Sequence, residues 1–214
     1  MELNQRMRVW FIGLAGALSS LCLAGPTGCV MIPIADILRH REAFAYYGAA
    51  GTERHIDKKI THANSINVGL FDRVELGYDN DFEGNTVYHG KLLLWESEKV
   101  DAAVSAGWMN WDPKSDYGEP YVVARYGIPN GPRLHVGAMR NDRWRAMFGV
   151  DHGLGNDWTV AADYVSGPDA YVWLGATYNI AKMPGVSISG NAGVPIRRSD
   201  GYQYSVFVNY GFRF

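Results

Sequence analysis

The last residues of the chain alternate strictly between two kinds of side chain. Counting back by two from the final residue gives only apolar or aromatic side chains: Phe214, Phe212, Tyr210, Val208, Val206 and Tyr204. Small or polar side chains, among them Asn209 and Ser205, occupy most of the positions between them. Because successive side chains of a β-strand point to opposite faces, this pattern predicts a strand with one apolar and one largely polar face.

The same alternation recurs throughout residues 42–214, in short segments separated by turn residues. In one of these segments Trp144 and Phe148 share a face, and Met147 and Asp151 share the other. The pattern predicts twelve strands, or ten if the first two pair poorly or merge, at about 42–51, 64–70, 73–81, 86–96, 100–111, 119–128, 132–140, 143–154, 158–166, 170–180, 185–196 and 202–214.

An even number of antiparallel strands with alternating faces is typical of a closed barrel that crosses a membrane. We therefore expect an all-β fold, a closed antiparallel transmembrane β-barrel over residues 42–214. A signal peptide and a short N-terminal arm are expected to precede it.

The first residues have the layout of a secretory leader. Arg6 and Arg8 precede an apolar run from Val9 to Ala24. This run is shorter than the roughly 20 residues that a membrane-spanning helix needs, so a signal peptide over residues 1–24 is favoured over an anchoring helix. Residues 25–41 are then an arm, either a short helix or an extended segment. Pro26 to Cys29 also resembles a bacterial lipoprotein cleavage box, so lipidation of Cys29 stays open as an alternative.

Composition narrows the class of protein further. The chain is 47% hydrophobic and 20% charged, with a net charge of −2, and beyond the leader no apolar stretch is long enough for a transmembrane helix. The near-neutral charge and the lack of a basic stripe argue against nucleic acid as a partner. The 25 Gly, 13 Tyr and 7 Trp residues suit tight hairpins, curved strands and aromatic girdles. Both cysteines lie in or beside the leader, so we expect no disulfide in the barrel.

The C-terminal strand, with Tyr210, Phe212 and a terminal Phe214, resembles the closing strand of Gram-negative outer-membrane β-barrels, in which that ending serves as an assembly signal. The resemblance implies an outer-membrane location, lipid around the apolar face and the barrel-assembly machinery as a partner. The arm and the segment from Gly69 to Gly77 resemble parts of small, uncharacterised, porin-like barrels. This resemblance concerns architecture and carries no named activity.

The face turned toward the lumen is where we expect function, because lipid-facing positions are costly places for polar groups. Charges of both signs fall on this face, which leaves two alternatives: a hydrated channel, or a network of paired charges across a blocked interior. Trp95, Trp111 and Trp173 are expected to point inward and to narrow the lumen. The residues expected to set ion preference are Arg73, Glu75, Lys91, Arg125, Arg133 and Arg145.

Other motifs give weaker hypotheses. Asp79 to Gly84 follows the start of a calcium loop, but Gly90 stands where the bidentate acid belongs. His55 and His62 are candidate metal ligands, and Asp151, His152 and Ser166 have the residue types of a hydrolase without its nucleophile elbow. We therefore expect no cofactor, no metal and no catalytic site.

The function expected from the sequence is a narrow passive channel for small hydrophilic solutes. The first alternative is a closed structural barrel that assists an envelope or polysaccharide-export complex, with envelope proteins as partners. The second is a lipid-modifying barrel enzyme.

Overall fold

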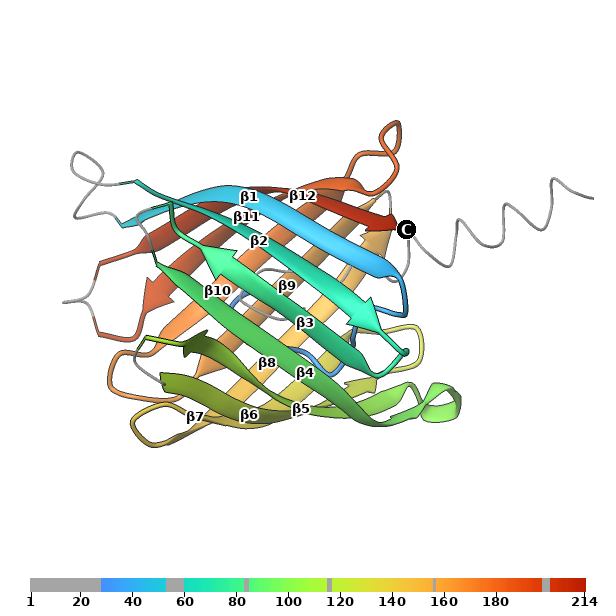
Figure 1. Cartoon of the computed structure of the whole chain (residues 1–214), viewed down its shortest axis with the longest axis horizontal. Helices are drawn as coiled ribbons and strands as arrows, with labels where there is room; N and C mark the ends of the chain where they lie inside the picture. Colours follow the sequence, from blue (N-terminus) through green and yellow to red (C-terminus); the bar gives the residue numbers. More distant parts are fainter. Residues whose placement is uncertain (1–27, 53–59, 83–84, 115–116, 156, 198–200) are drawn as a thin grey trace, which may run out of the picture.

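Twelve antiparallel strands form one closed barrel (Figure 1). The computed structural model of the chain describes residues 28–52, 60–82, 85–114, 117–155, 157–197 and 201–214. The predicted leader, His55 and the end of the predicted calcium loop lie outside the described residues. None of the described residues belongs to a helix long and apolar enough to cross a membrane.

The strands agree with the sequence prediction to within three residues at each end, so the alternative of ten strands is wrong. A single 3₁₀ turn, η2 (Glu98–Val100), interrupts their succession in the described chain. Their bounds are β1 Glu42–Thr52, β2 Thr61–Leu70, β3 Val74–Asn80, β4 Thr86–Ser97, β5 Ala102–Asp112, β6 Tyr117–Gly127, β7 Arg133–Arg140, β8 Trp144–Gly155, β9 Trp158–Val165, β10 Tyr171–Asn179, β11 Val186–Pro195 and β12 Gln203–Arg213.

The first and last strands close the barrel. Every strand pairs with its neighbours in sequence, and β1 also pairs with β12 along its whole length, from Glu42 opposite Arg213 to Thr52 opposite Gln203. Closure removes the edges that would otherwise leave backbone groups unpaired. We call the end of the barrel that holds Glu42 and Arg213 the base; the chain's C-terminus lies there (Figure 1).

The two faces of the wall differ as the alternation predicts. Outward side chains such as Phe148, Leu174 and Val208 are about half exposed, whereas their inward neighbours Met147 and Asn209 are buried. An apolar exterior around a filled interior is the arrangement of a transmembrane barrel.

Two tryptophans predicted to point inward point outward. The pairing of β4 with β5 shifts between Leu93 and Trp95, and the pairing of β5 with β6 shifts between Met109 and Asp112. A bulge adds one residue, so the side chains beyond it change face. Trp95 is accordingly 50% exposed and Trp111 is 38% exposed. Of the three predicted inward tryptophans, Trp173 keeps its predicted face, since a Cβ placed on inward-facing Gly193 would lie 2.9 Å from its ring.

Most of residues 28–41, the described part of the arm, lie inside the barrel (blue in Figure 1), and His40 and Arg41 at its end are exposed. Over residues 28–41 the arm forms no helix, so the prediction of a short helix is wrong there; the backbone is irregular rather than a regular extended segment. A bridge between Gly28 and Pro33 makes a tight turn at its tip. From there the arm runs to the base, where Arg41 joins β1.

Leu174→Arg tests the assignment of the outer face. Leu174 lies near the middle of β10 and is 51% exposed. Arginine there should lower the free energy of unfolding in lipid vesicles by roughly 2–4 kcal/mol, because its charge would face hydrocarbon. Denaturant titration of the refolded barrel measures this. The matched control is Ile196→Arg, just beyond the end of β11, where we expect a cost of about 0–1 kcal/mol. Equal costs at both positions would contradict the assignment.

Candidate functional site: the occupied lumen

The arm contributes the centre of an apolar core inside the barrel. Cys29, Ile32, Ile34 and Ala35 are at most 1% exposed. They belong to one cluster with inward side chains of the wall, namely Leu93, Ala103, Met109, Tyr121, Val123, Met139 and Met147. The lumen at this level therefore holds packed side chains between the arm and strands β4 to β8.

Asp163 on β9 holds the tip of the arm. Its Oδ2 accepts hydrogen bonds from three consecutive backbone N–H groups, those of Val30 at 2.6 Å, Met31 at 2.6 Å and Ile32 at 3.1 Å. These three donors stabilise Oδ2 of a buried carboxylate, which would otherwise have no hydrogen-bond partner. The thiol of Cys29 lies beside the neighbouring strand β8, 3.6 Å from the carbonyl oxygen of Val150.

Three further wall residues bind the arm's backbone. Lys91 donates through Nζ to the carbonyl oxygens of Ile34, at 3.3 Å, and Asp36. Ser105 donates to the carbonyl oxygen of Ala35 at 2.5 Å. Glu75 accepts from the N–H of Leu38 at 2.9 Å and also lies 3.7 Å from Lys91. The irregular backbone of the arm thus finds hydrogen-bond partners on β3, β4 and β5.

Asp36 links the arm to two arginines of the wall. Its Oδ1 lies 2.9 Å from Nη1 of Arg125, and its Oδ2 lies 3.2 Å from Nη1 of Arg133. Each arginine also pairs with a wall carboxylate, Arg125 with Asp101 at 3.0 Å and Arg133 with Asp151 at 2.8 Å. The arm therefore supplies one carboxylate to a network of charges that connects β6, β7, β8 and the turn before β5.

Nearer the base, the arm is anchored by Arg39, which donates to Glu96 at 2.6 Å. Burial lowers the pKa of Arg39, but the hydrogen bond and the charge of Glu96 outweigh it and hold this pKa above its ordinary value. Arg39 therefore stays charged at any physiological pH.

Inward glycines make room for the arm. A Cβ placed on Gly149 would lie 2.8 Å from Cδ1 of Ile32, and one placed on Gly175 would lie 2.9 Å from Cγ2 of Val30. On Gly69 a Cβ would collide with the backbone of Leu38 and Arg39. In the structure, the arm fills the space that these glycines leave.

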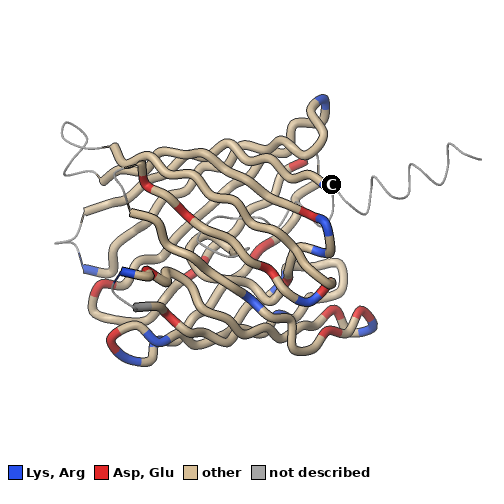
Figure 2. Tube along the Cα trace, in the orientation of Figure 1, with Lys and Arg blue, Asp and Glu red and all other residues tan. Residues whose placement is uncertain are grey.

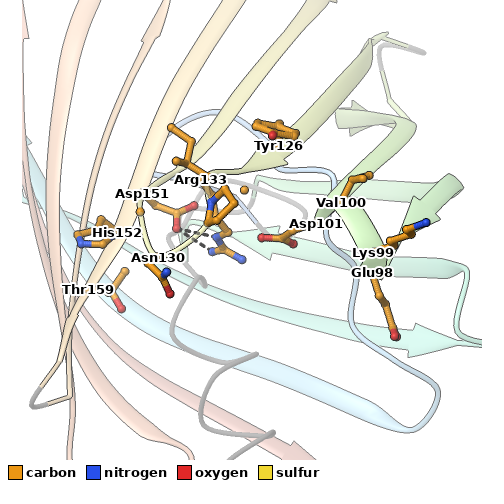
Figure 3. Close-up of a pocket in the computed structure, with 15 residues that line it drawn as sticks. Glu98, Lys99, Val100, Asp101, Tyr126, Asn130, Arg133, Asp151, His152 and Thr159 are labelled. Carbon is orange, nitrogen blue, oxygen red and sulfur yellow. Dashed lines mark hydrogen bonds and ion pairs between the residues drawn. The ribbon is translucent and has the colours of Figure 1, made fainter.

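A pocket of about 550 Å³ opens at the base, beside the arm (Figure 3). The η2 turn and the β6–β7 turn form one side of it, and β8 and β9 form the other. Figure 3 shows Arg133 and Asp151 joined in its wall, with Asp101 nearby. The pocket thus brings solvent close to the charges that hold Asp36.

The structure brings most of the predicted lumen residues together. Glu75, Lys91, Arg125 and Arg133 all contact the arm or its network. Arg145 lies toward the opposite end of the barrel, where it pairs with Asp142 at 3.0 Å. That hydrogen bond holds the pKa of Asp142 below its ordinary value.

The prediction that Arg73 faces the lumen is wrong. Arg73 lies in the turn between β2 and β3 at the base, and its side chain is exposed rather than directed into the lumen. The residue that ends a strand takes the geometry of the turn, so alternation no longer fixes its face. Tyr210, Phe212 and Phe214 form an outward row at the base: the rings of Tyr210 and Phe212 stack with centroids 5.3 Å apart, and the ring of Phe214 is tilted against that of Phe212 at 6.5 Å. Their role as an assembly signal stays a prediction.

In the structure, Asp151 and Ser166 of the hydrolase hypothesis have other hydrogen-bond partners than each other. Asp151 binds Arg133 and His135, and Ser166 accepts a hydrogen bond from the N–H of Ala146. His62 pairs with the hydroxyl of Tyr47 at 2.9 Å. Within the described ranges, no group of three or more His, Cys, Asp or Glu side chains is placed to hold a metal ion.

Sequence reasoning missed the partners of the arm. Asp36 was counted only as part of an arm, and Ser105 was not singled out, because no local pattern shows that an arm folds back into a lumen. The one available signal is the apolar spacing of Val30, Ile32 and Ile34, which is unusual for a segment in water.

Comparison with known proteins supports the fold. No protein-family model and no curated protein sequence matches the chain. Among solved structures, the KdgM porin is similar with a TM-score of 0.59 and 13% identity, over 79% of this chain and 99% of that chain. A structure described as the KdgM porin in complex with disordered oligogalacturonate is similar with a TM-score of 0.55, at the same identity and coverage. The chain therefore has the fold of a porin-like outer-membrane β-barrel.

Asp36→Ala should release the arm, and Cys29 reports the release. The substitution leaves Arg125 and Arg133 without their contact to the arm, and removing one partner of a buried ion pair is costly. We expect the rate of maleimide labelling of Cys29 in the mature, refolded barrel to rise about tenfold or more, since each ~1.4 kcal/mol lost multiplies the open population by ten. Asp142→Ala, which removes an exposed ion pair at the opposite end, is the control and should leave the rate unchanged. Equal rates in all three proteins would contradict the role of Asp36.

Proposed function

We propose that the protein is an outer-membrane channel for small hydrophilic solutes, and that solutes pass when the arm moves away from its place in the lumen. The observation that supports this most directly is the way the arm is held. Its backbone and Asp36 bind the wall through hydrogen bonds and ion pairs, with no covalent link.

The energetics of these contacts favour a releasable plug. Buried ion pairs contribute little net stability, because desolvation offsets their attraction. The ion pairs of Asp36 therefore add little net free energy to the retention of the arm, and we expect the arm to be displaced without unfolding of the wall. The porin-like fold and the apolar exterior support a location in the outer membrane, with lipid around the barrel and the base toward the periplasm.

The test is conductance of the refolded mature chain in a planar bilayer. We expect rare, brief openings of the unaltered chain. Asp36→Ala combined with Asp163→Ala should raise the open time about tenfold or more, because two of the polar anchors of the arm are removed. Asp142→Ala serves as the control and should behave as the unaltered chain does. Silence of the double variant, with folding verified by its mobility on a gel, would contradict the channel.

Ion preference is tested in the same double variant. Adding Arg125→Glu and Arg145→Glu reverses two lumen charges, so we expect the reversal potential in a salt gradient to shift toward cations. An exterior charge reversal, Arg143→Glu in the loop after β7, is the matched control. A reversal potential that stays the same after the two lumen changes would show that these arginines do not set selectivity.

A second candidate is a closed structural barrel that assists an envelope or export complex. The complete burial of Val30, Ile32 and Ile34 favours it, because apolar packing stabilises a closed lumen. This candidate predicts no conductance from any variant and an envelope protein that co-purifies with the barrel. The enzyme alternative has no comparable support and stays untested.

A further inference from the structure

The inner wall has one side without charges. In the described parts of β10, β11, β12, β1 and β2, the charged residues are Glu42 and Arg213, both at the base. Figure 2 shows the contrast with β3 to β9, which carry most of the charged positions of the strands. We call the uncharged inner surface of β10 to β12 the neutral wall; its buried residues are Thr177, Ser187, Ser189, Asn191, Ser205 and Asn209.

Hydroxyl and amide groups of the neutral wall bind one another across the strands. Asn209 donates through Nδ2 to Ser187 at 3.1 Å and to Ser189 at 2.9 Å. Asn191 donates through Nδ2 to Ser205 at 3.1 Å. Thr177 and Ser189 lie 2.9 Å apart. Both amides therefore use their donor groups within the wall.

The acceptor atoms of the same two amides have no hydrogen-bond partner in the wall. Asn191 is 7% exposed and Asn209 is 0% exposed, and Oδ1 of each has no hydrogen-bond partner. A buried acceptor without a partner costs about 1–3 kcal/mol, so this surface favours a molecule that brings uncharged donors. Hydroxyl groups, of water or of a solute, meet that requirement.

Aromatic rings lie on the same inner surface. Trp173, on the strand next to Asn191, packs against Gly193. Phe207, between Ser205 and Asn209 on β12, covers Gly48 and meets the ring of Tyr46 at 5.3 Å. Amide acceptors beside aromatic faces suit a molecule whose ring has an apolar C–H face and a rim of hydroxyls.

The polar contacts of the arm are on the opposite side, since its hydrogen bonds and ion pairs described above go to residues of β3 to β9. Two apolar side chains of the arm also reach the uncharged side, because Val30 lies beside Gly175 of β10 and Leu38 packs with Phe44 and Tyr46 of β1. A charged solute on the neutral wall would lose water without gaining a counter-charge, which costs much more than burying a hydroxyl.

We propose that the neutral wall binds uncharged polyhydroxyl solutes, such as short saccharides, within the lumen. This inference rests on the proposed function, because it names the class of solute that the channel carries. The solute binds when the arm has moved away: Asn191 and Asn209 then accept hydrogen bonds from its hydroxyls, and Trp173 contacts its apolar face.

The test is calorimetric titration of the refolded mature chain, carrying Asp36→Ala and Asp163→Ala to free the arm, with two trisaccharides. Maltotriose is uncharged, and trigalacturonate carries carboxylates. We expect maltotriose to bind at least about tenfold more tightly than trigalacturonate. Equal binding of the two, or tighter binding of trigalacturonate, would overturn the proposal.

Variants locate the site. Asn191→Leu with Asn209→Leu, and separately Trp173→Leu, should each weaken maltotriose binding about tenfold or more. Leu174→Ala, next to Trp173 but on the outer face, is the control and should bind as before. Maltotriose affinity that is unchanged in both lumen variants would overturn the proposal. Binding as expected, together with silence in the bilayer, would support the saccharide site and reject the channel.

Discussion

Closure of β1 onto β12 is the constraint on which the rest of the structure depends. In hydrocarbon no backbone donor or acceptor can be left unpaired, so the sheet must join its own ends. Twelve closed strands enclose an interior that is wider than the interior of an eight-stranded barrel, which side chains fill, and narrower than the interior of the large porins. The arm occupies part of this intermediate space, and inward glycines such as Gly149 and Gly175 adjust the wall to its width.

The arm in turn explains where the charges lie. Irregular backbone at membrane depth is tolerated only inside protein and only with hydrogen-bond partners. Asp163, Lys91 and Ser105 provide those partners, and each is an inward residue on a different strand between β4 and β9. The charges that sequence reasoning assigned to ion selectivity therefore have a structural task as well, since they hold a segment of the chain's own backbone.

The sequence predicted local features well and long-range ones poorly. Strand number and bounds followed from alternation, because the membrane enforces an outward apolar face at each strand. The faces of Trp95 and Trp111 were wrong, because a bulge shifts register without leaving a pattern in the residues. The pairing of Asp36 with Arg125 and Arg133 joins residues about a hundred positions apart, and nothing local to Asp36 indicates it. The charged residues of the wall were predictable as a set, whereas the segment that they bind, the arm, was not.

The two sides of the lumen are suited to different tasks. Paired charges on β3 to β9 are directional and costly to leave unpaired, which makes them fit to hold one fixed segment. Hydroxyls and amides on β10 to β12 form weaker, rotatable contacts, which suit a molecule that binds and leaves. If the charges were spread evenly around the lumen, every solute would compete with the arm for the same partners. Separation of the two sides gives the arm and a solute different polar partners in the lumen.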